Sequence, residues 1–458
     1  MGLPDTGDTA WMLTSSALVL LMTLPGVAFF YGGMVRSKNV LNTMMMSAMS
    51  MGIVTVLWCI YGFSMAFGDD EGGVVGNPGQ YFGLKGLLSG NSAAAVPADA
   101  ATGTAATDAV NIPLFGTMPA MVFVAFQLMF AIITVALISG AVADRMKFGA
   151  WTVFTVIWAT VVYFPVAHWV FSFDGFTAET GGWIANKLGA IDFAGGTAVH
   201  INSGVAGLIL VLFLGKRKGW PGTPMRPHNL PFTMLGAGLL WFGWYGFNAG
   251  SAGSANGVAG ATFLTTTVAT ATAMLFWLLT ERIRDGHATS LGAASGIVAG
   301  LVAITPSCSS VDVWGAIIIG ACAGVICALA VGLKYKLGYD DALDVVGVHL
   351  VGGLLGTILI GFLATEKAPA AVNGLFYGGG VEQLWKQIVG AGAVLAYSAV
   401  VTAIIAVVLK YTIGLRADVE DEATGLDESQ HAESGYDFTP IGGGSALAQS
   451  GVSLGKEA

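Results

Sequence analysis

Residues Asp192–Gly204, DFAGGTAVHINSG, open an apolar segment that continues as VAGLILVLFLG. The stretch places a carboxylate, Asp192, and a titratable ring, His200, at membrane depth. A titratable group in hydrocarbon is costly and therefore marks a functional site by default. We accordingly expect the chain to be organised around a membrane-embedded site that contains His200.

A second stretch of similar build, Asp344–Gly353 (DVVGVHLVGG), opens a later apolar segment. His349 follows Asp344 by about one and a half turns of a helix. Two histidines that enter the membrane from corresponding parts of two half-chains indicate one shared pore.

The composition excludes an ordinary soluble domain. Hydrophobic residues make up 55% of the 458 residues, charged residues only 10%, and the mean hydropathy is +0.73, whereas soluble domains carry about 25% charged residues. The 66 glycines would weaken soluble helices, but between membrane helices they permit close backbone approach. The chain is predicted to be an integral membrane protein of many tightly packed helices.

The net charge of -9 comes mainly from the end of the chain. Residues 413–458 hold nine acidic and two basic residues, which leaves 17 basic against 19 acidic residues before them. Four cysteines show no close-paired metal spacing and are predicted to be packing residues: Cys59, Cys308, Cys322 and Cys327. We expect neither a metal site nor a cofactor, and no nucleic-acid partner.

Eleven apolar runs are long enough to cross a membrane, since a spanning helix needs about 20 residues. They lie near 10–31, 42–67, 118–143, 148–171, 196–214, 231–251, 258–280, 288–306, 313–333, 343–364 and 385–412. An odd number of spans places the two termini on opposite sides. Fifteen Lys and Arg residues fall on one side and four on the other, so the positive-inside rule predicts an external amino terminus and a cytoplasmic tail.

The spans divide into two halves, about 10–214 and 231–364, because the histidine-bearing stretches open the fifth and tenth spans; helix 385–412 stands alone. Five spans per half invert the second half relative to the first, and inverted repeats place a site near the bilayer midplane. Residues 1–412 are thus predicted to form an all-α membrane domain, and residues 413–458 an acidic cytoplasmic tail. The small, polar external loop 68–117 is expected to be a flexible insertion.

His200 and His349 have two readings. In the simpler one they are buried neutral rings bonded to neighbouring backbone. In the functional one they line a pore, where neutral imidazole offers one donor and one acceptor and can pass on a small hydrogen-bonding molecule.

Asp192 can cap the helix that starts near Gly195, and a carboxylate near the outer mouth also favours an approaching cation. The two roles are compatible. Asp344 is expected to cap the tenth span from the cytoplasmic side, like Asp340 and Asp341 before it.

Large aromatics and small residues alternate in Trp241–Gly257 at the outer end of the sixth span. An interfacial aromatic belt explains some of this. However, Phe247 and Ser251 lie one turn apart on one face, and so do Phe126 and Phe130 on the third span. Rings and a hydroxyl together can hold a small ammonium-like cation by cation–π attraction and a hydrogen bond.

Several long motifs in order resemble the ammonium transporter family (Amt/MEP/Rh), and within it the bacterial Amt branch. They are FFYGGMVRSKNVLN (Phe29–Asn42), DFAGGTAVHINSG, PHNLP (Pro227–Pro231), GWYGFNAGSAGSAN and DDALDVVGVHLVGG. The resemblance implies a membrane protein with eleven helices in two inverted five-helix halves, assembled as a homotrimer with one pore per subunit.

The resemblance also implies roles for single residues. His200 and His349 line the pore, and Phe130 and Phe247 close its outer mouth. Three further residues match the external cation site: Phe126, Ser251 and the supporting Asp192.

One position departs from the family pattern. Where the cation cage usually has a Trp, this chain has Phe171, with Trp169 two residues earlier. Phe has the weaker cation–π face, so the affinity of the cage, and which ring completes it, are open.

The activity implied is ammonium uptake across the cell membrane, with methylammonium as an analogue of the substrate. An intact ion in a low-dielectric pore costs on the order of 20 kcal/mol in the Born limit, whereas neutral ammonia avoids most of that. We therefore predict capture of ammonium outside, loss of its proton, and passage of ammonia; potassium has no proton to lose. Whether net charge crosses is open, and an ammonium sensor with little transport is the alternative.

The tail has two parts. Gly414–Tyr436 resembles the family's ordered cytoplasmic tail, which couples subunits and helps to dock a PII-type signalling protein. The last twenty residues are expected to be disordered. A membrane enzyme that uses the histidines as acid and base lacks a cofactor or nucleophile motif nearby, so the protein is predicted not to be an enzyme.

Overall fold

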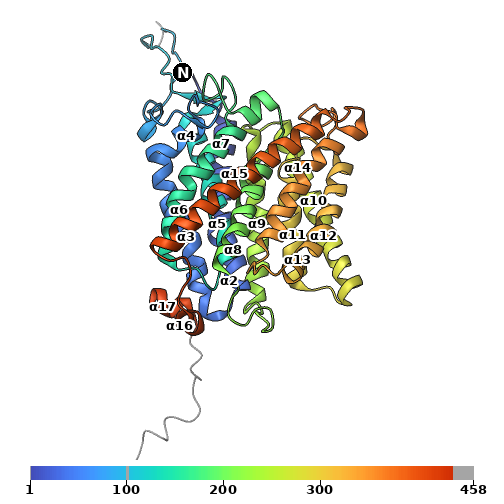
Figure 1. Ribbon diagram of the computed structural model, residues 1–458. Helices are drawn as coiled ribbons and strands as arrows, with labels where there is room; N and C mark the ends of the chain where they lie inside the picture. The colour runs from blue at the N-terminus through green and yellow to red at the C-terminus, as the bar shows by residue number, and fades with distance from the viewer. Residues whose placement is uncertain (1, 99–102, 437–458) are drawn as a thin grey trace, which may run out of the picture.

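The computed structural model describes residues 2–98 and 103–436 and shows a bundle of long helices that run roughly side by side (Figure 1). Within these residues, nine helical stretches are long and apolar enough to cross a membrane: Thr6–Met34, Ser37–Phe67, Ala120–Val142, Phe148–Phe171, Gly196–Leu214, Gly257–Asp285, Val313–Leu337, Val346–Leu363 and Glu382–Thr412. The expected helical membrane architecture is confirmed at this level.

The chain through residue 214 contains α1 (Thr6–Leu21), α2 (Ala28–Met34), α3 (Val40–Leu57), α4 (Phe63–Phe67), α5 (Ala120–Val142), α6 (Phe148–Trp158), α7 (Phe164–Phe171) and α8 (Asn202–Leu214). The rest of the bundle contains α9 (Leu230–Asn248), α10 (Gly257–Asp285), α11 (Ser290–Ile304), α12 (Val313–Ala330), α13 (Leu333–Leu337), α14 (Val351–Leu363) and α15 (Glu382–Thr412).

Two expected spans are helical but fall outside the nine. They are α9, at 231–251, and α11, at 288–306, and both lie inside the bundle among the other helices (Figure 1). α11 is apolar but has only 15 residues. The number of eleven spans therefore stays a prediction.

Short π-helical turns occur in several of the spans. Three of them, η1 (Met22–Val27), η3 (Trp58–Gly62) and η5 (Ala159–Tyr163), join two helices, whereas η7 (Gly196–Ile201) and η9 (Val346–Leu350) open the spans that continue as α8 and α14. A π turn widens the helix locally and is common at functional sites. His200 lies in η7 and His349 in η9, so both histidines occupy such turns.

Glycines let the helices approach closely, as the composition predicted. A Cβ atom on Gly356 of α14 would lie 1.9 Å from the carbonyl oxygen of Ala303 on α11. On Gly236 of α9 it would lie 2.3 Å from the backbone nitrogen of Phe30 on α2. Neither position can accept a side chain without moving a helix.

We expect Gly356→Ala to lower the free energy of unfolding by about 1–3 kcal/mol, because the added methyl group overpacks the contact between α14 and α11. Thermal unfolding of the detergent-solubilised protein measures this. Gly392→Ala is the matched control, since a Cβ at Gly392 of α15 meets no atom within 4 Å. Equal melting temperatures for the two variants would contradict the prediction.

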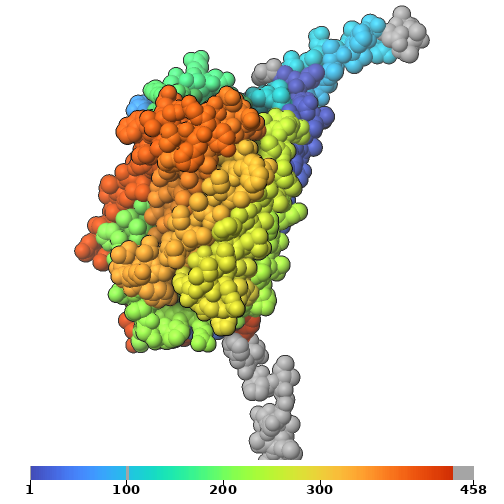
Figure 2. Space-filling view, turned by 90° about the vertical axis from the view of Figure 1, so that its right-hand side faces the viewer, coloured from blue at the N-terminus to red at the C-terminus, as the bar shows by residue number. Residues whose placement is uncertain are grey.

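The loop after α4 carries more structure than the flexible insertion expected from its composition. Strands β1 (Asp70–Glu71) and β2 (Val75–Gly76) pair antiparallel, and so do β3 (Leu114–Phe115) and β4 (Met118–Pro119). Between them, Ala93 pairs with Val110 and Val96 with Thr107. This part of the chain projects beyond the helical body (Figure 2).

Buried ion pairs hold the opposite end of the bundle. Arg217 bonds to Asp340 at 2.7 Å and to Asp144 at 3.2 Å, and Arg36 reaches Asp144 at 3.1 Å. Burial alone would raise the pKa of Asp340, but the hydrogen bonds and charge of Arg217 outweigh it and hold this pKa below its usual value. Asp340 was expected to cap the tenth span. It pairs with Arg217 instead.

The tail folds against this end of the bundle through α16 (Val419–Thr424) and α17 (Leu426–His431) (Figure 1). Glu422 accepts from the backbone nitrogen of Lys218 at 2.6 Å, and Asp427 accepts from the backbone nitrogen of Asn42 at 2.8 Å. The expected order of the first part of the tail is confirmed. The last twenty residues lie outside the described part of the chain.

Candidate functional site

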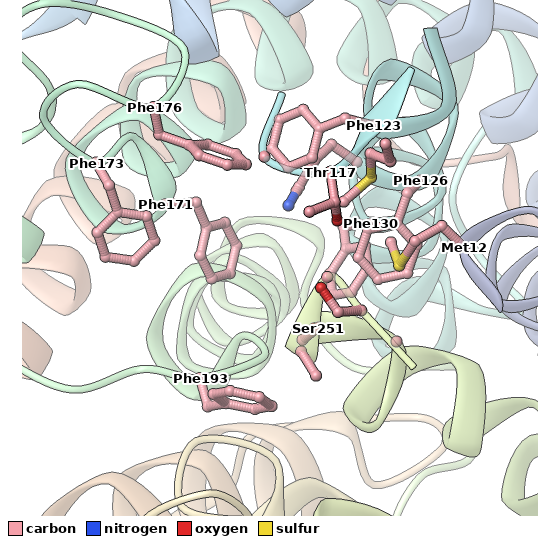
Figure 3. A pocket seen from close by; sticks show the side chains of 17 residues that line it. Met12, Thr117, Phe123, Phe126, Phe130, Phe171, Phe173, Phe176, Phe193 and Ser251 are labelled. Atoms are coloured by element: carbon pink, nitrogen blue, oxygen red, sulfur yellow. The ribbon is translucent and has the colours of Figure 1, made fainter. Parts of the chain in front are cut away.

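An aromatic pocket of about 370 Å³ opens where the start of α1, α5, α7 and the turn after α9 come together (Figure 3). Its labelled lining residues are Met12, Thr117, Phe123, Phe126, Phe130, Phe171, Phe173, Phe176, Phe193 and Ser251. All three residues predicted to hold the cation by ring or hydroxyl lie there: Phe126, Phe171 and Ser251.

The pocket suits a small cation. Phe126 and Phe130 project from α5 with ring centroids 5.0 Å apart, and Phe171 lies 6.2 Å from Phe130. Ring faces carry negative charge density that attracts a cation. The Ser251 hydroxyl donates to the carbonyl oxygen of Phe247 at 2.8 Å, so its lone pairs can accept from an N–H group.

Phe171, and not Trp169, is the ring of α7 that lines this pocket. The Trp169 indole donates to the carbonyl oxygen of Val74 at 2.7 Å. It packs against Trp183 and Tyr397 with centroids 5.8 and 4.7 Å away. Of the two candidate rings, Phe171 therefore faces the pocket and Trp169 does not.

Two stacked phenylalanines lie directly inward of the pocket. The rings of Phe130 and Phe247 are 4.2 Å apart with an angle of 22° between their planes, and both are buried. Phe130 lines the pocket, while Phe247 lies 6.1 Å from the ring of His200. The stack therefore separates the pocket from the histidine.

His200 and His349 form a buried pair. Their Nδ1 atoms lie 3.2 Å apart, and their rings stack with centroids 5.3 Å apart. One Nδ1 must donate and the other accept, so the pair shares a proton between its rings. In the described chain the Nε2 atom of His200 has no protein partner, and a small cavity of about 10 Å³ adjoins His349.

Asp192 holds the start of η7. One carboxylate oxygen accepts from the backbone nitrogens of Gly195 and Gly196 at 2.7 and 2.6 Å. The other accepts from the nitrogens of Thr197 and Ala198 at 2.7 and 3.2 Å, and from the Thr197 hydroxyl. The predicted capping role is confirmed.

Asp192 does not line the aromatic pocket. It faces a second cavity of about 380 Å³, which shares Phe173, Phe193 and Ser251 with the first. The three shared residues therefore lie between the Asp192 carboxylate and a cation in the aromatic pocket.

Asp341 is the counterpart of Asp192, and of the three aspartates expected to cap the tenth span it is the one whose capping role is confirmed. Asp341 accepts from the backbone nitrogen of Val346 at 2.7 Å, five residues later, as Asp192 accepts from Thr197. In both stretches the histidine follows the capping aspartate by eight residues. This shared spacing is the signal in the sequence that distinguishes Asp341 from the other two.

Asp344 was wrongly expected to cap the tenth span. It occupies the position that matches Gly195, and both have positive φ angles, 65° and 119°. Its carboxylate instead reaches the Lys334 ammonium at 2.7 Å. Burial raises the pKa of Asp341 to about 6, against the opposing attraction of Lys334.

Comparison with known proteins identifies the family to which this chain belongs. The profile of the Ammonium Transporter Family matches residues 10–436. An ammonium transporter of Mycobacterium tuberculosis is 72% identical over 453 residues, covering 98% of this chain and 93% of the relative. The crystal structure of Candida albicans Mep2 is 34% identical with a TM-score of 0.79, covering 91% of this chain and 87% of that chain.

A solved sensor Amt protein is also similar, at 26% identity and a TM-score of 0.81, covering 93% of this chain and 98% of that chain. Family profile, relatives and structures agree over nearly the whole length. The chain belongs to the ammonium transporter family and is a multi-pass membrane protein.

Proposed function

We propose that the protein takes up ammonium by binding it in the aromatic pocket, removing its proton and conducting ammonia past the phenylalanine stack and along the two histidines. The released proton crosses separately through the His200–His349 pair, so that net charge moves with each ammonia. The observation that carries this proposal is the unbroken row of pocket, Phe130–Phe247 stack and His200–His349 pair. Each member of the row lies next to the following one.

The residues divide the work. Phe126, Phe171 and Ser251 hold the cation, and Phe130 with Phe247 excludes ions from the apolar path. Neutral ammonia crosses that path at far lower cost than a charged ion. His200 and His349 offer it one donor and one acceptor inside the membrane.

Asp192 supports the site by fixing η7, on which His200 stands. It also adds a negative potential near the outer mouth, which favours the approach of a cation.

The arrangement in the membrane follows from the same reasoning. We propose eleven spans in two inverted halves within residues 1–412, with the amino terminus outside and the tail in the cytoplasm. The start of α1 and the α16–α17 tail lie at opposite ends of the bundle (Figure 1), and the two capped histidine turns share one spacing. We further propose a homotrimer in the cell membrane, with a PII-type protein docking on the cytoplasmic face.

The test is the current across proteoliposomes after a pulse of ammonium, with potassium as the control cation. We expect a current with ammonium and none with potassium. A pH change inside the vesicles without current would indicate an ammonia channel that returns the proton outside. Absence of both signals would reject transport and favour a sensor, the second candidate function, which the similarity to the sensor Amt protein supports.

We expect Phe171→Trp to lower the apparent KM for methylammonium about threefold, because indole has the stronger cation–π face. The maximal rate should stay within a factor of two, since the later steps lie beyond the stack. Uptake of labelled methylammonium over a range of concentrations measures both constants. A raised KM would show that the pocket has no room for the larger ring.

A further inference from the structure

We propose that His168, held by Asp70, is a positioning residue for the aromatic pocket, an inference that rests on the proposed function. His168 is fully buried in α7 and does not line the pocket. Its Nδ1 atom lies 3.1 Å from the carbonyl oxygen of Ala66, and its Nε2 atom lies 3.1 Å from a carboxylate oxygen of Asp70.

The two partners define the protonation of the pair. A backbone carbonyl oxygen cannot donate, so Nδ1 must carry a proton toward Ala66. A second proton must then lie between Nε2 and the Asp70 carboxylate, because otherwise two lone pairs would face each other. His168 and Asp70 thus share a proton, and both ring nitrogens of His168 are engaged.

This pair ties α7 to the external segment. Asp70 belongs to β1, its other carboxylate oxygen accepts from the backbone nitrogen of Gly73 at 2.9 Å, and its own nitrogen donates to the carbonyl oxygen of Thr180 at 2.9 Å. Ala66 lies in α4. The end of α4, strand β1 and the 180–182 segment therefore converge on one imidazole.

The end of α7 also packs tightly against the backbone of Gly181 and Gly182. A Cβ atom on Gly182 would lie 1.9 Å from the carbonyl oxygen of His168, and one on Gly181 would lie 2.2 Å from that of Ser172. The end of α7 is thus clamped from the protein side by glycines and from the outside by the His168–Asp70 pair. We call this arrangement the α7 clamp.

The α7 clamp lies next in sequence to residues that line the aromatic pocket, so it can fix the positions of their rings. Three of the pocket rings, Phe171, Phe173 and Phe176, follow His168 within eight residues. In Figure 3, Phe171 and Phe173 lie across the pocket from Phe126 and Phe130, whereas Phe176 packs against Phe123 with ring centroids 5.2 Å apart. A shift of the end of α7 would move the Phe171 and Phe173 rings away from a bound cation while leaving the Phe130–Phe247 stack and the histidines in place.

The expected signature is a change in KM without a change in maximal rate. In Asp70→Ala the Nε2 atom loses its partner, and the KM for methylammonium should rise about tenfold, as for loss of a cation–π contact in a desolvated pocket. Asp70→Asn should restore the wild-type KM within a factor of two, because its amide donates to a neutral imidazole of the same tautomer.

Trp169→Phe is the matched control. It removes the hydrogen bond from the neighbouring side chain to Val74, in the turn between β1 and β2, but keeps an aromatic ring, so its KM should stay within a factor of two of wild type. Asp70→Ser, whose hydroxyl is too short to reach Nε2, is the second variant and decides the question where Asp70→Ala does not reach the membrane. The same rise is expected.

Thermal stabilisation by methylammonium reports binding independently of transport. A wild-type protein that is stabilised but takes up no methylammonium would reject the proposed function and leave the clamp to be judged by the binding constant alone. A wild-type KM and binding constant in Asp70→Ala or Asp70→Ser would overturn the positioning role. So would a loss of maximal rate at unchanged KM.

Discussion

In the His200→Ala variant, we expect the ammonium-evoked current to fall by about 100-fold or more, the usual range for loss of a group that handles a proton. The substitution removes the ring between Phe247 and His349 and leaves the Nδ1 atom of His349 buried without its partner at 3.2 Å. Ammonia that passes the stack then meets no donor or acceptor at that depth.

The measurement is the current across proteoliposomes on an ammonium pulse, with methylammonium-dependent thermal stabilisation as the test of binding. Binding should survive, because no atom of His200 lines the aromatic pocket. His287→Ala controls for removal of a histidine, since His287 is exposed between α10 and α11. Currents of wild-type size in His200→Ala would refute conduction along the histidine pair.

The second large effect is expected for Asp192. Asp192→Ala leaves four backbone N–H groups at the start of η7 without their acceptor. Each buried unpaired donor costs about 1–3 kcal/mol, so we expect the free energy of unfolding to fall by roughly 4 kcal/mol or more and transport to be lost. Asp192→Asn keeps one acceptor oxygen but turns an amide group toward donors, so it should also lose transport with a smaller loss of stability.

Thermal unfolding and the ammonium-evoked current, measured on the same preparation, separate the two effects. Asp108→Asn is the control for removing a carboxylate, because Asp108 is exposed on the projecting segment. Wild-type currents in Asp192→Asn would show that four backbone bonds to a carboxylate are not needed to hold His200 in place.

Much of the bundle could be predicted from apolar length alone. Every long apolar run became a helix, because backbone groups in hydrocarbon must bond within their own segment. What the runs did not reveal are the π turns at His200 and His349, since one extra residue in a turn leaves hydropathy unchanged. The pairing of Ala93 with Val110 and of Val96 with Thr107 was also missed, because single Val and Thr residues among small ones form no alternating run of strand length.

Site residues could be predicted from the sequence where a side chain is of a type that is rarely found at its depth in a membrane. His200 and His349 stood out in this way and the α5 phenylalanines by their spacing, and they lie together. Asp341 did not, because three nearby aspartates competed for one capping role and only the geometry distinguishes the cap from the partners of Arg217 and Lys334. The Asp70 partner of His168 lies 98 residues away in sequence, beyond any local pattern.

The spacing of 4.2 Å between the Phe130 and Phe247 rings has a consequence for a cell that is not importing nitrogen. Ring faces this close leave no volume for water, so no file of hydrogen-bonded molecules connects the outside solution to His200 at rest. We therefore expect the idle protein to carry no current, and each crossing to require the rotation of a phenylalanine ring. Turnover should accordingly carry the steep temperature dependence of a packed side chain's rotation and not the shallow one of diffusion through an open hole.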